Sequence, residues 1–140
     1  MPARTRYCKH GGMSDVIDFG KGDGLVPVIV QDDASGTVLM LAYMNRAAFD
    51  RTVASGYATY WSRSRRDFWV KGETSGNRQL VRAVHVDCDG DTILLRVTQQ
   101  GGAACHEGYE SCFFRRHEGD AWRVIAERIV DPSALYGKKP

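Results

Sequence analysis

The chain has 140 residues, of which 43% are apolar and 26% charged, a balance typical of one compact globular domain. The formal net charge is only +2, so the overall charge does not indicate a nucleic-acid or membrane partner. No apolar run approaches the roughly 20 residues that a membrane-spanning helix needs, and no signal-peptide core is visible near the start. We therefore expect a soluble cytoplasmic protein whose four cysteines act as metal ligands or core residues rather than as disulfides.

The start of the chain, residues 1–13, is polar and has no hydrophobic pattern, and it is expected to be a poorly ordered N-terminal extension. Cys8 and His10 lie in it, and a ligand pair on such a segment is not expected to bind a functional metal ion. Residues 14–140 are expected to form the folded domain.

Local patterns predict a β-rich domain. Two aliphatic stretches separated by turn-forming residues indicate a hairpin of buried strands over residues 25–31 and 38–44. A short amphipathic helix is expected over 46–55, with Asn45 as its N-cap and Gly56 as the residue that ends it. The predicted fold class is therefore α+β, a single domain with one main helix. Further strands are expected over 57–62, 80–89, 92–99, 112–116 and 122–130.

One expected strand ends in the sequence Asp-Cys-Asp-Gly-Asp. Along an extended chain alternate residues share a face, so Asp87, Asp89 and Asp91 would converge on one side and Cys88 would point to the other. Clustered carboxylates with no Lys or Arg beside them suit Mg²⁺. The alternative is an Asp-Gly turn with solvated carboxylates.

A glycine-rich segment over 101–112 holds Cys105 and Cys112, with His106 next to the first. Together with Cys88 they supply three thiolates, and three protein ligands with an open fourth position are typical of catalytic zinc. His106 is then either a fourth ligand or a base beside a zinc-bound water. In the alternative interpretation the cysteines are small apolar residues of the core and the histidine belongs to a loop.

The segment over 61–77 alternates basic, hydroxyl and aromatic residues around glycines. Guanidinium groups, hydroxyls and exposed backbone amides bind phosphate, and indole rings stack on a base. The segment thus predicts a site for a phosphorylated ligand, although single-stranded nucleic acid on Trp61 and Trp69 or a plain solvated hairpin are alternatives. The candidate ligand-binding residues are Trp61, Arg63, Arg65, Lys71, Glu73, Thr74 and Ser75.

Seven short motifs stand in order along residues 18–137: GLVP at 24–27, LMLAYMN at 39–45, WSRSR at 61–65, KGETSGN at 71–77, DCDGD at 87–91, ACH at 104–106 and SCF at 111–113. Taken together they resemble the phosphoribosyl-AMP cyclohydrolase family, which performs an early step of histidine biosynthesis. The resemblance implies the single-domain form of that enzyme, without the pyrophosphohydrolase domain of its bifunctional relatives.

The resemblance also implies the roles of the site residues. Zinc would be shared across a homodimer, held by Cys88 of one subunit and by Cys105 and Cys112 of the other. Magnesium would be held by the three aspartates of the DCDGD motif. Zinc-activated water would open the N1–C6 bond of the adenine ring of phosphoribosyl-AMP, with His106 as the base. Glu107 departs from the small hydroxyl residue that many members have there.

Three other interpretations are weaker or remain open. A cytidine-type deaminase would need His-x-Glu and Pro-Cys-x-x-Cys motifs, which the chain lacks. A Nudix-like hydrolase would need a Glu-rich helix, whereas Asp50 is the single acid in the expected helix over 46–55. The alternative outside enzymes is a zinc-stapled dimeric module that binds nucleotides or RNA, in which His106 would complete a closed four-ligand site.

Overall fold

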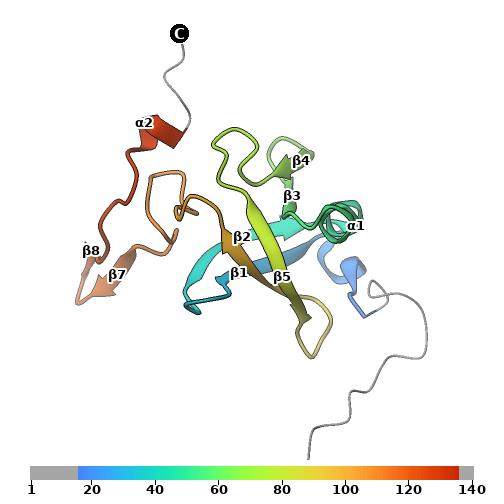
Figure 1. Ribbon diagram of the computed structural model, residues 1–140. Coiled ribbons are helices and arrows are strands. Elements are labelled where there is room, and N and C mark those ends of the chain that lie inside the picture. The colour runs from blue at the N-terminus through green and yellow to red at the C-terminus, as the bar shows by residue number, and fades with distance from the viewer. Residues whose placement is uncertain (1–15, 136–140) are drawn as a thin grey trace, which may run out of the picture.

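The structure is a computed structural model that describes residues 16–135 (Figure 1). The expected extension over 1–13, with Cys8 and His10, lies outside the described residues. The α+β class with one main helix is confirmed. The elements are η2 (Phe19–Gly22), β1 (Val26–Asp32), β2 (Val38–Met44), α1 (Arg46–Ser55), β3 (Thr59–Ser62), β4 (Asp67–Val70), β5 (Gln79–Val86), β6 (Ile93–Gln99), β7 (Arg115–Glu118), β8 (Ala121–Val124) and α2 (Pro132–Leu135).

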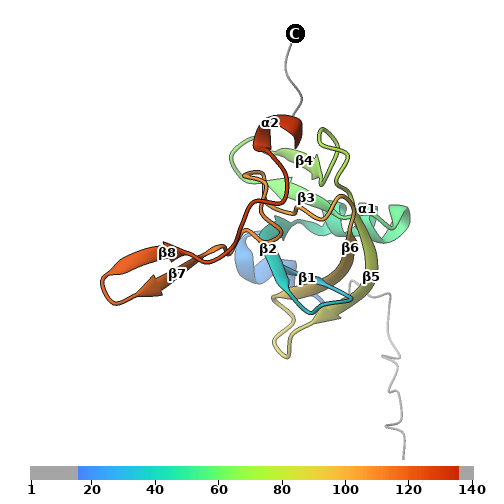
Figure 2. The same ribbon diagram turned by 60° about the vertical axis from the view of Figure 1, so that its left-hand side comes forward.

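The main sheet has four strands in the order β2-β1-β6-β5. β1 runs antiparallel to β2 and parallel to β6, and β5 runs antiparallel to β6. Figure 2 shows that this sheet is strongly curved and that the β7–β8 hairpin projects away from it. The β3–β4 hairpin packs against β2, and α1 covers β3.

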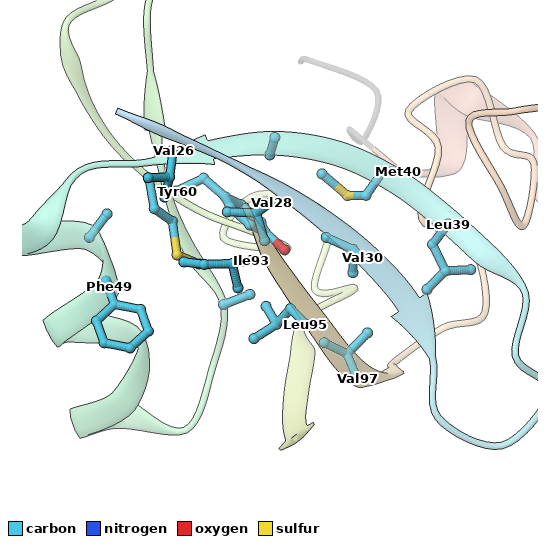
Figure 3. Packing of buried hydrophobic residues seen from close by; sticks show 14 of the residues in the cluster. Val26, Val28, Val30, Leu39, Met40, Phe49, Tyr60, Ile93, Leu95 and Val97 are labelled. Atoms are coloured by element: carbon cyan, nitrogen blue, oxygen red, sulfur yellow. The ribbon is translucent and has the colours of Figure 1, made fainter. Parts of the chain in front are cut away.

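The core lies on the inner face of the curved sheet (Figure 3). Alternate residues of β1 and β6 point inward, as the period of two along a strand requires. A register shift between Val30 and Gln31 in β1 lets two successive residues of β2, Leu39 and Met40, both be buried. Each such aliphatic side chain contributes about 1.5–3 kcal/mol on burial. The inward residues of the two central strands are Val26, Val28, Val30, Ile93, Leu95 and Val97.

The helix and the strand before it have the predicted bounds. Asn45 Oδ1 accepts a hydrogen bond from the Ala48 amide at 2.8 Å, as an N-cap does. Gly56 ends the helix with φ at 80°, a conformation that favours glycine. These boundaries depend on residues adjacent in sequence, which explains why the sequence predicted them.

For three of the predicted strands, the predicted first or last residue is wrong. The strand expected over 80–89 ends at Val86, because the chain turns so that the Asp87 amide donates to the Thr92 carbonyl. The strand expected over 112–116 begins only at Arg115. The strand expected over 122–130 ends at Val124, and the amides of residues 129 and 130 donate instead to the Gly108 carbonyl.

A buried polar network joins the sheet to the loop that follows β4. The hydroxyl of Tyr60 donates to Gln79 Oε1, and Gln79 Nε2 donates to Gln99 Oε1 at 2.8 Å. Gln99 Nε2 in turn donates to the Asn77 carbonyl at 2.7 Å. Burial raises the pKa of Tyr60, so the phenol stays protonated and keeps its donor. The network therefore fixes residue 77 relative to the core.

Candidate functional site

The loop that carries two of the cysteines lies along the free edge of β2. Ser111 Oγ donates to the Val38 carbonyl at 2.6 Å, and the Cys112 amide donates to the Leu39 carbonyl at 2.7 Å. These bonds account for the late start of β7, because the amide of residue 112 is already paired with β2. The edge of the main sheet thus positions Cys112.

Cys105 and Cys112 lie close together. Cys105 is 3% exposed and packs with Tyr109 and Phe114, whose rings are stacked 3.8 Å apart. Desolvation of the sulfur, together with the neighbouring Cys105 thiol, raises the pKa of Cys112 to about 11. Two adjacent thiols that form no disulfide are a donor set that fits a thiophilic metal such as zinc.

Lys71 lies beside this cysteine pair. The residue is 8% exposed, and its ammonium donates to the Ala104 carbonyl at 2.6 Å. Burial lowers the pKa of Lys71, while the two nearby cysteines, Cys112 and Cys105, oppose that shift. Its ammonium thus faces the cysteine loop, and its expected role as a phosphate ligand stays a prediction.

His106 has an exposed side chain directly after Cys105. The loop around it is held from two sides: the Glu107 amide contacts Cys105 Sγ at 3.4 Å, and Arg128 Nε donates to the Glu107 carbonyl at 2.9 Å. The imidazole is therefore accessible to a ligand while its backbone is fixed.

Cys88 is far from the other two cysteines within one chain. It lies in the turn between β5 and β6, whereas Cys105 follows the opposite end of β6, and both views show these loops at opposite ends of the sheet (Figures 1 and 2). A seven-residue strand spans about 20 Å. Among residues 16–135, no three His, Cys, Asp or Glu side chains are grouped to hold a metal ion. One subunit alone does not assemble the expected three-cysteine site.

The three aspartates of the same turn do not converge as predicted. The prediction assumed an extended chain, but the chain turns after Val86, and Asp89 Oδ1 accepts a hydrogen bond from Cys88 Sγ at 2.9 Å. That bond, with desolvation, raises the pKa of Cys88. Asp87 Oδ1 accepts hydrogen bonds from the amides of Asp91 and Thr92 at 3.1 and 3.2 Å. The charge of Asp89 still raises the pKa of Asp91, but the three carboxylates are not grouped to hold a metal ion in the described part of the chain.

Asp87 and Asp91 nevertheless form a close pair. Desolvation raises the pKa of Asp91, and so do the hydrogen bond that its protonated carboxyl donates to Asp87 and the negative charge of Asp87. The absence of a basic neighbour in sequence was misleading, because η2 brings Lys21 Nζ to 3.9 Å from Asp91 Oδ2 and 2.9 Å from the Asp89 carbonyl. The two carboxylates and the carbonyl are oxygen donors of the kind a hard divalent cation takes, but such a cation would have to displace the Lys21 ammonium from them.

All seven predicted ligand-binding residues line two cavities that share Trp69. The larger cavity, about 530 Å³, has walls from β2, β3 and β4 and from the turn after β3. In it, the guanidinium of Arg63 lies 3.9 Å from the ring centre of Tyr43, and Trp61 forms another wall. The smaller cavity, about 230 Å³, is lined by Arg65, Trp69, Val70, Lys71, Gly72, Glu73, Thr74 and Ser75.

Sequence analysis missed Tyr43 as part of this site and treated Trp69 only as one surface for stacking bases. In the sequence, Tyr43 is one residue of a largely aliphatic strand and gives no sign of a ligand site. It comes close to Arg63 because β3 pairs with β4 and this hairpin packs on β2. The alternation of buried and less buried residues along β2 could have indicated this position, because Tyr43 lies between two buried residues and therefore points away from the core.

The sequence of this chain was compared with protein families and with known proteins. A family model described as phosphoribosyl-AMP cyclohydrolase matches residues 40–114, a stretch that includes both cavities and all three cysteines of the domain. The chain belongs to the phosphoribosyl-AMP cyclohydrolase family. A relative of that name from Solibacter usitatus is 54% identical over 88% of this chain and 98% of its own length. Another from Desulforapulum autotrophicum is 56% identical over 86% and 97%.

The family is one of enzymes, so membership favours catalysis over a zinc-stapled binding module that does no chemistry. A third relative of that name, from Nitrosomonas europaea, is 54% identical over 89% of this chain. In the described part of the chain, neither helix has the length or apolar character needed to cross a membrane.

Proposed function

We propose that this protein hydrolyses the N1–C6 bond of the adenine ring in 1-(5-phosphoribosyl)-AMP, as a step of histidine biosynthesis. One observation carries the proposal beyond family membership. A cavity with aromatic walls and a cavity with basic and hydroxyl walls meet at Trp69, and Lys71 connects the second cavity to the cysteine pair. A base and its phosphates therefore have adjacent places in one subunit, next to the two cysteines that this subunit would contribute to a zinc site.

The substrate suits hydrolysis at this position. A second ribose phosphate on N1 weakens the resonance of the adenine ring, so C6 is a better electrophile than in AMP. Addition of water places an oxygen on C6, and cleavage of the N1–C6 bond leaves a carboxamide at C6 and a proton on N1. The protein must therefore hold the ring, hold two phosphates and move protons between these atoms.

The larger cavity is proposed to hold the ring. Trp61, Trp69 and Tyr43 offer aromatic faces, and stacking on such faces contributes about 1–3 kcal/mol per base. Arg63, exposed and stacked on Tyr43, has guanidinium donors left for a phosphate. In the smaller cavity, Arg65, Thr74 and Ser75 are proposed to hold the second phosphate, with Glu73 at the rim.

Cys105 and Cys112 are proposed to hold zinc together with Cys88 of a second copy of the chain. When bound, zinc lowers the pKa of water from 15.7 towards about 7, so that hydroxide is available at neutral pH. The distance between the two cysteine loops within one subunit supports a ligand set divided between two subunits. Asp87 and Asp91, with Asp89 beside them, are proposed to hold magnesium near a substrate phosphate.

The exposed β7–β8 hairpin supports a homodimer. All four residues of β8 are exposed, and Trp122 has 70% of its surface accessible. Val124 and Ile125 add exposed apolar surface to the hairpin, which projects from the body of the subunit (Figure 2). Apolar surface of this kind marks an interaction site. A symmetric partner would cover it and supply the missing cysteine.

His106 is proposed as the proton shuttle. Its exposed imidazole follows a zinc ligand directly, and as a ligand it would close the coordination position that water needs. The imidazole would accept the proton of the new C6 hydroxyl and return a proton to N1 as the bond breaks. An imidazole carries one nitrogen that can accept a proton and one that can donate a proton, which suits both transfers.

The test is direct. Purified protein of measured zinc content is mixed with phosphoribosyl-AMP, and ring opening is followed by ultraviolet absorbance, with AMP as the matched control. We expect turnover of phosphoribosyl-AMP and none of AMP. A dimeric, zinc-loaded preparation that leaves the absorbance of phosphoribosyl-AMP unchanged would refute the proposal.

A further inference from the structure

Lys71 is the one basic residue of the smaller cavity that is buried. It begins the loop after β4, and its ammonium donates to the carbonyl of Ala104, the residue before Cys105. The same ammonium lies 5.5 Å from the ring centre of Trp69, the residue shared by both cavities. A buried ammonium is costly unless it is paired, so these contacts are not incidental.

A second contact fixes the other end of the same loop against the cysteine loop. Asn77 lies so close to Gly101 that a Cβ there would be 2.0 Å from Asn77 Oδ1. On its other side, a Cβ on Gly72 would be 2.3 Å from the carbonyl carbon of Asn77. Both glycines have positive φ, at 76° and 84°. Asn77 therefore packs closely both on Gly101 of the cysteine loop and on Gly72 of its own loop.

We infer that Lys71 is a positioning residue, which fixes Cys105 relative to the cavity lined by Thr74 and Ser75, and is not a phosphate ligand. One of its three N–H donors is already engaged by the Ala104 carbonyl at 2.6 Å, and the residue is only 8% exposed, so its strongest contact is with the cysteine loop and not with the open side of the cavity. Arg65, which lines the same cavity and is exposed, supplies the cation that the phosphate needs. The inference rests on the proposed function in that Cys105 is taken as a metal ligand.

The first test uses metal-free protein and does not depend on activity. In wild type, Cys105 is 3% exposed and should be alkylated slowly by iodoacetamide, followed by mass spectrometry of its peptide. Lys71→Met keeps the apolar stem and removes the donor. A hydrogen bond to a charged group contributes about 1.5–3 kcal/mol, so alkylation of Cys105 should be about 10- to 100-fold faster. Lys21→Met is the matched control, since Lys21 also donates to a carbonyl, that of Asp89, and should leave the Cys105 rate unchanged.

The second test uses zinc-loaded protein. Lys71→Met should release zinc faster to a chelator and lower kcat, with KM for phosphoribosyl-AMP close to the wild-type value. Arg65→Met should show the reverse, with a raised KM and normal zinc release. A raised KM in Lys71→Met, with wild-type Cys105 alkylation and zinc release, would overturn the inference in favour of a phosphate ligand.

Two further outcomes are distinguishable. If wild type neither binds zinc nor opens the ring, the proposed function fails, while the alkylation rates still decide the role of Lys71. If Lys71→Met does not fold, Lys71→Gln retains a neutral donor and should give an intermediate alkylation rate. Wild-type alkylation in Lys71→Gln, combined with a raised KM, would again overturn the inference.

Discussion

At the scale of single residues, Arg63 connects the aromatic cavity to solvent. Its guanidinium stacks on Tyr43 at 3.9 Å, so the side chain is held in place before a ligand arrives. Arg63→Ala should raise KM for phosphoribosyl-AMP about 10- to 100-fold, because a hydrogen bond to a charged group contributes about 1.5–3 kcal/mol. Steady-state kinetics with parallel zinc analysis measures this.

The matched control for Arg63 is Arg51. Its guanidinium also stacks on an aromatic ring, that of Phe68 at 3.6 Å, but it lies on α1 and lines neither cavity. Arg51→Ala should leave KM unchanged. Equal KM values in both variants would remove Arg63 from the substrate site.

His106 gives the second prediction at this scale. His106→Asn should lower kcat by about 10²–10⁴, the usual contribution of a general acid or base, while zinc content stays at the wild-type level. His85→Asn, at another exposed histidine on β5, should have normal kcat. Lost zinc in His106→Asn would instead identify a ligand, and near-normal kcat would leave His106 as an ordinary loop residue.

At the scale of elements, the β1–β2 hairpin contains a pH-sensitive turn. The Ser35 amide and hydroxyl donate to Asp32 Oδ2 at 2.7 and 2.8 Å, and they lower the pKa of Asp32. A lowered pKa in the folded state stabilises the fold above the unfolded value of about 3.9, and this stabilisation is lost as pH falls through the folded value.

The corresponding variant is Asp32→Asn. The difference in free energy of unfolding between wild type and this variant should be largest near neutral pH and should shrink below about pH 4. Urea denaturation across this pH range measures the difference. A constant difference at every pH would mean that the charge of Asp32 does not stabilise the turn.

The bounds of elements could be predicted where neighbouring residues set them. Asn45 and Gly56 limit α1 through bonds and backbone angles within a few residues, and the expected helix is confirmed. β5 ends at Val86 because the Asp87 amide finds the Thr92 carbonyl across a turn. Alternating hydrophobicity does not report such pairings, so the strand was predicted too long.

At the scale of the whole molecule, Cys88 and Cys105 lie far apart within one subunit. Whether two subunits share the zinc site can therefore be tested by mixing two variants that are each inactive. Cys88→Ser and Cys105→Ser should each be inactive as homodimers. If each zinc site takes Cys88 from one subunit and Cys105 from the other, a mixed dimer retains one intact site. Unfolding and refolding the two variants together should restore about a quarter of the wild-type activity and zinc content, the statistical share of intact sites.

The controls follow from the same geometry. Cys105→Ser mixed with Cys112→Ser should restore nothing, because both variants lack a ligand from the same loop. Activity in that mixture, or none in the mixture of Cys88→Ser with Cys105→Ser, would contradict a site divided between subunits. Size-exclusion chromatography checks that the mixed species are dimers.

The sequence by itself determined the fold class, the main helix, the family resemblance and the residue types of the site. These depend on local pattern and on motif order, which the linear chain contains. The seven ligand-binding residues predicted from one segment do line two joined cavities, since the segment over 61–77 forms one hairpin and its following loop.

Only the tertiary structure decided which groups meet. It brought Lys21 to the aspartates, joined Asp89 to Cys88 by a hydrogen bond and placed the ammonium of Lys71 on the cysteine loop. It also separated Cys88 from the cysteines that the sequence grouped with it. The physical reason is that such contacts join residues far apart in the chain, and they depend on strand order, sheet curvature and the paths of loops, none of which a local pattern specifies.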